Sequence, residues 1–184
     1  MRIGIDVDDV IYDWFGRAHE RCEAAGITNG VVPSRWEMYD DYGVDLNTWL
    51  AVIELATLDS SLYMGEPLPG AVEALQRLRD AGHTLHIVTA RGFLAHGDLI
   101  RKHTIEWLRA YDVPHDTLTF SKRKSIVQTD VFVDDSWKNV QELVAAGVPT
   151  WMVDAPHNQG VQYAHRVPSV VEFAAEILAM ETVQ

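Results

Sequence analysis

The chain has 184 residues, of which 47% are hydrophobic, and its formal net charge at pH 7 is -12. This length suits one domain with a substantial core. The acidic excess disfavours a long nucleic-acid partner, because such binding relies on Lys and Arg neutralising successive phosphates. The single Cys22 excludes an internal disulfide. No apolar run approaches the roughly 20 residues of a membrane span, and no signal-peptide pattern opens the chain. We therefore expect a soluble cytoplasmic protein.

Short apolar segments alternate with helical patterns along the chain. Apolar runs, as opposed to alternating patterns, are typical of parallel strands that are buried on both faces. Helical periodicity between the runs ends at Gly82 and at Gly147. The alternation predicts an α/β fold with a doubly wound, Rossmann-like parallel sheet. The predicted strands are Ile3–Ile5, Thr84–Val88, Thr117–Phe120, Val131–Val133 and Thr150–Val153.

The interval between the first two predicted strands is too long for a simple crossover. A βαβ unit needs roughly 30 residues, yet the first strand ends at Asp6 and the second begins near Thr84. The surplus carries helical patterns over Tyr12–Ala25 and Leu46–Leu58, around a turn-rich, aromatic middle. We interpret it as a small inserted helical cap over the edge of the sheet. The predicted division is a core of residues 1–12 and 67–184 and a cap of residues 13–66.

Polar residues directly follow the predicted strands. They are Asp6, Thr89, Ser121, Asp134 and Asp154. Open α/β sheets bind ligands in the crevice outside the carboxyl ends of their strands, so these side chains are expected to converge. Two of the positions open acidic clusters, in which like charges repel unless a cation lies between them. Mg²⁺ suits such a set of carboxylates, whereas the alternative interpretation is that the clusters are only helix caps and turns.

The ordered combination of motifs resembles the haloacid dehalogenase superfamily, specifically its aspartate-dependent phosphatases. The matching residues are Asp6 and Asp8 in "DVDDV", Thr89 in "HIVTAR", Lys124, and Asp134 and Asp135 in "VFVDD". The spacing from the lysine to the acidic pair is similar to that of the 5'(3')-deoxyribonucleotidase branch. The sequence departs from the family pattern at Asp9, where Gly is common. Lys122 competes with Lys124 for the lysine motif, and the spacing favours Lys124.

The resemblance implies a reaction through a phosphorylated aspartate. Asp6 would attack phosphorus as the nucleophile, and Asp8 would protonate the leaving group and later take a proton from water. The Mg²⁺ ligands implied are the carboxylates of Asp6 and Asp134 and the main-chain carbonyl of Asp8, with Asp135 orienting a water.

Further residues are expected to bind the phosphoryl group. Thr89 and the Ala90 N–H would contact its oxygens, and Lys124 would neutralise its charge and that of Asp6. Arg91, two residues beyond Thr89, is a weaker candidate for holding substrate.

The substrate class is predicted from the aromatic content of the cap. Trp36 and Tyr39 lie in its turn-rich part, and Trp14 follows the first acidic motif. These rings either build the small core of the cap or stack on a planar base, since every base offers a π-face. We predict an Mg²⁺-dependent phosphatase of nucleoside monophosphates. The alternatives are a phosphatase of another small metabolite or of a nucleic-acid end, and a non-catalytic binding module.

Overall fold

The structure is a computed structural model that describes residues 1–93 and 95–181. Its strands are β1 (Arg2–Ile5), β2 (Thr84–Thr89), β3 (Thr117–Phe120), β4 (Val131–Asp134), β5 (Thr150–Val153) and β6 (Arg166–Val167). Its helices are α1 (Trp14–Ala24), α2 (Met38–Tyr42), α3 (Leu46–Leu58), α4 (Ala71–Asp80), α5 (Gly97–Ala110), α6 (Trp137–Ala145) and α7 (Val170–Glu181). The short 3₁₀ helices are η1 (Lys124–Ile126) and η2 (Pro156–Asn158). Within the described residues, none of these helices has the length and apolar character needed to cross a membrane.

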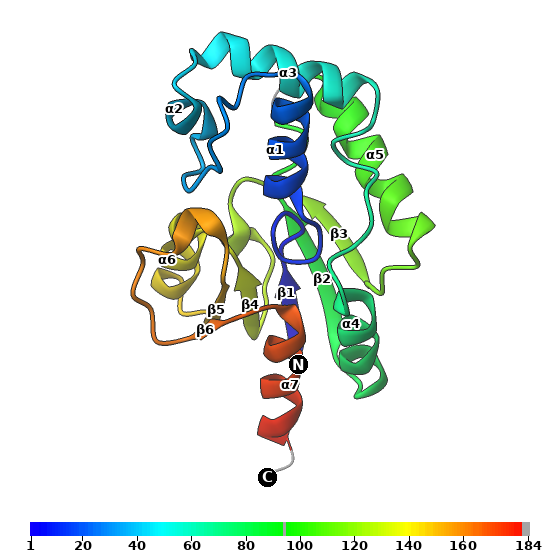
Figure 1. Cartoon of the computed structure of the whole chain (residues 1–184). Helices are drawn as coiled ribbons and strands as arrows, with labels where there is room; N and C mark the ends of the chain where they lie inside the picture. The colour runs from blue at the N-terminus through cyan, green and yellow to red at the C-terminus, as the bar shows by residue number, and fades with distance from the viewer. Residues whose placement is uncertain (94, 182–184) are drawn as a thin grey trace.

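The strands form a six-stranded parallel sheet in the order β3-β2-β1-β4-β5-β6 (Figure 1). The doubly wound α/β class and the five predicted strands are confirmed. The short β6 was not predicted, because two residues are too few to form a recognisable apolar run. It pairs with Met152 and Val153 of β5. Chain order runs outward from β1 through β2 to β3 and then restarts at β4, so a topological switch point lies between β1 and β4.

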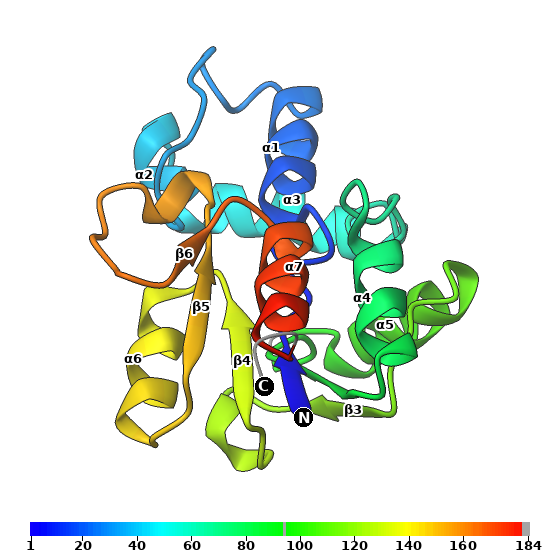
Figure 2. The ribbon, with the colours of Figure 1, turned by 90° about the horizontal axis from the view of Figure 1, so that it is seen from below.

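Helices cover both faces of the sheet. On one face α4 and α7 pack against each other (Figure 2), while α6 packs on β4 and β5. Alternate residues of a strand point to opposite faces, so Val131 and Val133 of β4 belong to the main hydrophobic cluster, while Phe132 between them joins a second cluster with Val88 and Leu143. The central strands are therefore apolar on both faces, which explains why they appear in the sequence as continuous apolar segments.

Close packing of β1 against β4 depends on a glycine. Gly4 pairs with Phe132 of β4, and a Cβ at Gly4 would lie 2.1 Å from a carbon of that ring. A side chain at this position would push the ring away. The glycine thus helps to hold the carboxyl ends of β1 and β4 together.

Helices α1, α2 and α3 lie beyond the carboxyl ends of the strands, in the upper part of Figure 1. The predicted helix Leu46–Leu58 is confirmed as α3 and packs against α1. Helix α1 begins at Trp14 and not at the predicted Tyr12, because Asp13 is its N-cap and accepts a hydrogen bond from the Gly16 N–H (2.8 Å). The division of the chain into a core and a separate cap stays a prediction.

Candidate active site

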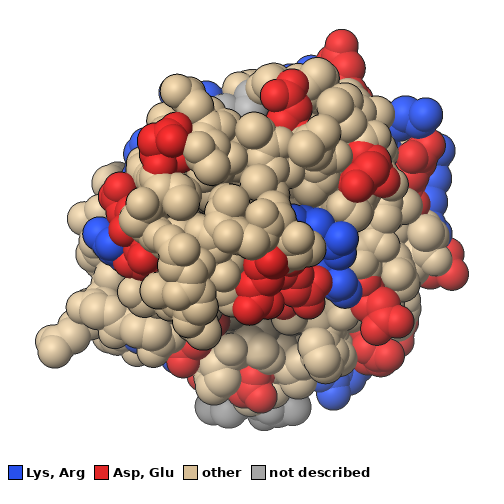
Figure 3. All heavy atoms as spheres, turned by 45° about the horizontal axis from the view of Figure 1, so that its top comes forward, with Lys and Arg blue, Asp and Glu red and all other residues tan. Residues whose placement is uncertain are grey.

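The carboxyl ends of the three central strands bring predicted polar residues together. Asp6 follows β1, Thr89 ends β2 and Asp134 ends β4, and β1 pairs with both neighbours. The side chains therefore meet at the switch point of the sheet, where open α/β folds bind ligands. Figure 3, in which the top of Figure 1 is turned toward the viewer, shows acidic side chains that gather on the surface next to a few basic ones.

Lys124 is fully buried between the two acidic motifs. Its Nζ lies 2.6 Å from Asp6 Oδ1 and 3.6 Å from Asp134 Oδ2, and it donates a hydrogen bond to the Val88 carbonyl (2.7 Å). Lys122 is exposed, and its Nζ lies 5.7 Å from the centre of the Phe93 ring. Of the two candidate lysines, the structure brings Lys124 to the carboxylates.

Burial is the largest influence on the pKa values of Asp6, Asp134 and Lys124. It raises the pKa of Asp6 to about 7, against the lowering effect of Lys124, and the charge of Asp134 adds to the rise. Burial likewise raises the pKa of Asp134 to about 6. For Lys124, burial lowers the pKa, but the facing carboxylates outweigh it and the net shift is upward. One ammonium group is therefore too little positive charge for the buried carboxylates.

Asp134 is oriented by the helix that follows it. Its Oδ1 accepts hydrogen bonds from the Ser136 N–H (2.9 Å) and from Asn139 Nδ2 (3.0 Å), and Asn139 Nδ2 also lies 3.2 Å from Oδ2. Asn139 was missed in the sequence, although its position one turn into a helix after an acidic motif was a usable signal.

Asp135 is held by the loop after β5. His157 Nε2 lies 2.8 Å from Asp135 Oδ2, and Asn158 Nδ2 donates to the main-chain carbonyl of Asp135 (2.8 Å). Burial raises the pKa of Asp135, and the hydrogen bond with His157 opposes this rise. Sequence reasoning missed both loop residues, because no motif surrounds them.

The three carboxylates Asp6, Asp134 and Asp135 could hold a divalent cation. Each offers an oxygen, and these oxygens all lie within 4.8 Å of one another. All three side chains are buried and the donor set consists only of oxygen, which fits a hard ion such as Mg²⁺. The side chain of Asp8 is engaged elsewhere.

Asp8 forms an ion pair with Arg91. The Nε and Nη2 atoms of Arg91 both donate to Asp8 Oδ1, at 2.8 and 2.6 Å. The guanidinium carbon lies 4.8 Å from the centre of the Tyr12 ring and 5.0 Å from that of Tyr63, and Arg91 is only 4% exposed. Arg91 was predicted to hold substrate, but this placement ties its side chain to Asp8.

Asp9 occupies the position where the resembled family commonly has Gly. Its φ is 56°, in the left-handed region that Gly adopts freely and Asp tolerates. The Phe15 N–H donates to Asp9 Oδ1 (2.9 Å). Burial raises the pKa of Asp9 to about 9, and the negative charge of Asp135 is the second largest cause of the rise. The substitution thus keeps the turn and adds a buried carboxyl group.

Thr89 and Ala90 lie at the end of β2, next to Arg91. Thr89 is fully buried and its Oγ1 accepts a hydrogen bond from the Arg91 N–H (3.2 Å). Ala90 is exposed. Thr89 directly follows Val88, whose carbonyl accepts a hydrogen bond from Lys124.

Two of the three aromatic candidates lie together. Trp14 and Trp36 are stacked with ring centres 5.2 Å apart, and Trp36 makes a T-shaped contact with His157 at the same distance between ring centres. Trp36 keeps 45% of its surface exposed. Tyr39 instead packs on Trp49, 5.9 Å away, so the structure does not bring it to this pair.

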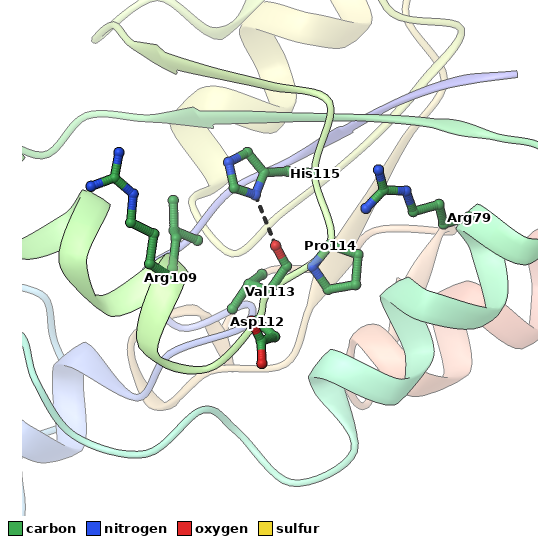
Figure 4. Close-up of a pocket in the computed structure, with 7 residues that line it drawn as sticks. Arg79, Arg109, Asp112, Val113, Pro114 and His115 are labelled. Carbon is green, nitrogen blue, oxygen red and sulfur yellow. Dashed lines mark hydrogen bonds between the residues drawn. The ribbon is translucent and has the colours of Figure 1, made fainter.

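A cavity of about 490 Å³ lies at the opposite, amino-terminal edge of the sheet (Figure 4). Arg79, Arg109 and the segment Asp112–His115 line it, and His115 Nδ1 donates to the Val113 carbonyl (2.8 Å). These residues precede β2 and β3 and are separate from the acidic cluster at the other strand ends.

Comparison with known proteins places the whole chain in one family. The family described as "5' nucleotidase, deoxy (Pyrimidine), cytosolic type C protein" matches residues 1–182. A curated relative from Chlorobaculum tepidum, named provisionally as a 5'(3')-deoxyribonucleotidase, is 27% identical over 165 residues, which cover 80% of this chain and 76% of the relative.

Solved structures agree on the fold. A HAD-superfamily hydrolase from Geobacter sulfurreducens is similar with a TM-score of 0.55 and 18% identity, over 95% of this chain and 98% of the other. The D,D-heptose 1,7-bisphosphate phosphatase from B. bronchiseptica, complexed with magnesium and phosphate, is similar with a TM-score of 0.54 and 15% identity. The match covers 98% of this chain and 99% of the other. At such identities the likeness shows the fold alone, and the match over residues 1–182 shows the family. The chain therefore belongs to the 5'-nucleotidase family, is a phosphatase, and has the fold of the haloacid dehalogenase-type hydrolases.

Proposed function

We propose that the protein is an Mg²⁺-dependent phosphatase that hydrolyses nucleoside 5'-monophosphates through an aspartyl-phosphate on Asp6. The observation that carries the proposal is the buried Asp6–Lys124–Asp134 arrangement at the switch point. A small phosphate ester suits a site in which local cations offset a strongly acidic chain.

The chemistry of a phosphate monoester explains the positive charge at this site. Both the ester and the attacking carboxylate are anionic, so positioning and charge stabilisation supply most of the rate. Asp6 attacks phosphorus in line, forming an acyl phosphate as the bond to the leaving alkoxide breaks. The ammonium group of Lys124, 2.6 Å from Asp6, reduces the repulsion, and Thr89 and the Ala90 N–H bind phosphoryl oxygens.

The carboxylates of Asp6, Asp134 and Asp135, with the main-chain carbonyl of Asp8, would hold Mg²⁺. When bound, the ion supplies positive charge to the phosphoryl oxygens and to its carboxylate ligands. Asn139 keeps Asp134 in place and His157 keeps Asp135 in place, as outer partners of metal ligands commonly do.

Chelation of divalent cations is expected to lower the melting temperature, and to lower it more at pH 8 than at pH 6. The folded pKa of Asp6, about 7, lies above the ordinary value of 3.8. The metal-free folded state therefore binds more protons than the unfolded state, and this stability is lost as the pH rises through about 7. Mg²⁺ replaces the missing positive charge and stabilises by mass action.

Melting curves in Mg²⁺ and in EDTA across this pH range measure the effect. A melting temperature that stays flat across an Mg²⁺ titration at pH 8 would support the reading of the carboxylates as caps and turns.

Asp8 is the proposed general acid and base, and Arg91 is its positioning residue. Asp8 protonates the departing alkoxide and then takes a proton from the attacking water. Both bonds from Arg91 go to Oδ1 of Asp8, so the arginine fixes the direction of the carboxyl group. Tyr12 and Tyr63 fix the arginine in turn.

Arg91→Lys is expected to lower kcat on the order of 10²-fold for nucleotides, because the two-bond hold on Asp8 is lost. The loss should be much smaller for p-nitrophenyl phosphate, whose leaving group needs no proton. Steady-state kinetics on both substrates, with a pH profile, separate the effects. A rise in KM at constant kcat would instead assign Arg91 to substrate binding.

The aromatic pair supports a nucleotide substrate. Trp36 is stacked on Trp14, next to the loop that holds Asp135, and still exposes 45% of its surface. An exposed ring beside the site offers a surface for a base, and such stacking contributes roughly 1–3 kcal/mol.

Trp36→Ala is expected to lower kcat/KM for nucleoside monophosphates by roughly 10- to 100-fold, which corresponds to that stacking energy. Activity on deoxyribose 5-phosphate should be spared, since this substrate has no base. Tyr39→Ala is the matched control, because its ring packs on Trp49. Equal losses for nucleotide and sugar phosphate would favour the alternative of another phosphorylated metabolite.

A further inference from the structure

A second cluster of metal-ligating groups adjoins the three carboxylates. Asp9, Asp135 and His157 each offer a ligand atom within 4.8 Å of the others. They come from the turn after β1, the end of β4 and η2 after β5. Asp135 is common to this cluster and to the three carboxylates described above.

The carboxyl group of Asp9 lacks the partner that its burial calls for. Asp9 is 8% exposed, and its Oδ2 is buried without a hydrogen-bond partner. Buried polar atoms are nearly always paired, and an unpaired buried charge is costly. The largest charge effects on Asp9 come from carboxylates, Asp135 first and then Asp8 and Asp13. Lys124 is already shared between Asp6 and Asp134.

We propose that Asp9, Asp135 and His157 form a second divalent-cation site, which shares Asp135 with the Mg²⁺ ligands of the proposed function. Two carboxylates and one imidazole suit Mn²⁺ or Zn²⁺, whereas Mg²⁺ prefers oxygen ligands alone. His157 Nε2 and Asp135 Oδ2 share one hydrogen bond, 2.8 Å long. A bound cation would displace the proton between them, so that His157 changes from a hydrogen-bond partner of Asp135 into a ligand beside it.

The surroundings hold the imidazole in place. The ring of His157 lies 5.4 Å from that of Phe15 and 5.2 Å from that of Trp36. Phe15 also donates its N–H to Asp9 Oδ1, which leaves Oδ2 free to bind a cation.

The test is the number of Mn²⁺ ions bound per chain, measured by equilibrium dialysis and titration calorimetry on the full chain. Wild type is expected to bind two, and Asp9→Gly and Asp9→Asn one each, because both residues accept the left-handed backbone of position 9. His157→Gln should weaken the second ion roughly 10-fold or more. His115→Gln, a histidine at the opposite edge of the sheet, is the control and should keep both.

The outcomes separate this site from the proposed function. One Mn²⁺ in wild type that Mg²⁺ displaces would overturn the second site and leave the Mg²⁺ ligands standing. Two ions that survive in both Asp9 variants would also overturn it. No bound ion in wild type would contradict both proposals.

Discussion

Asp6→Asn is expected to abolish turnover while the protein still folds. The amide cannot attack phosphorus, so the covalent intermediate cannot form. The fold should survive because the substitution keeps the shape of the side chain, and Lys124 retains Asp134 at 3.6 Å and the Val88 carbonyl as partners. Removal of one carboxylate also relieves repulsion in the metal-free cluster.

Turnover of a nucleoside monophosphate and a thermal melt of the same sample measure the two halves of this expectation. Asp13→Asn is a matched control, because Asn also caps helices well and Asp13 caps α1 outside the carboxylate cluster. Full activity in Asp6→Asn would remove Asp6 from the mechanism.

Asp8→Asn should lower kcat/KM for nucleotides on the order of 10²- to 10⁴-fold, because proton transfer is lost while the nucleophile remains. The amide oxygen can still accept the bonds that Arg91 donates to Oδ1, so the loss reports chemistry and not a collapsed pocket. For p-nitrophenyl phosphate the loss should be far smaller. Equal losses on p-nitrophenyl phosphate and an alkyl phosphate would withdraw the acid–base role.

Much of the fold could be predicted from the sequence, because strands that are buried on both faces appear as continuous apolar segments. Val131–Val133 reads as a run, since its residues serve two hydrophobic clusters. The polar residue after each run marks the carboxyl edge of the sheet, which is how the meeting of Asp6 with Asp134 could be predicted. The two-residue β6 had no such signal, because its position follows from pairing with β5.

The partners of the site residues were harder to predict. The Arg91–Asp8 pair joins positions that are 83 residues apart, and its geometry depends on the rings of Tyr12 and Tyr63. His157 lies in a loop after β5 without a motif. Such contacts are set by packing between distant elements, which hydrophobic periodicity does not encode. The choice of Lys124 over Lys122, by contrast, followed from the spacing to Asp134, and the structure places Lys124 Nζ 2.6 Å from Asp6 Oδ1.

Rapid-quench capture of the phosphoenzyme decides whether Asp6 is the nucleophile. Wild type is mixed with Mg²⁺ and a nucleoside monophosphate labelled in its 5'-phosphate, and the reaction is stopped with acid within one turnover. We expect a protein-bound label that is stable to acid, is released by hydroxylamine, maps to the peptide containing Asp6 and is absent from Asp6→Asn. Turnover without any labelled protein, or label that persists in Asp6→Asn, would rule out an aspartyl-phosphate on Asp6.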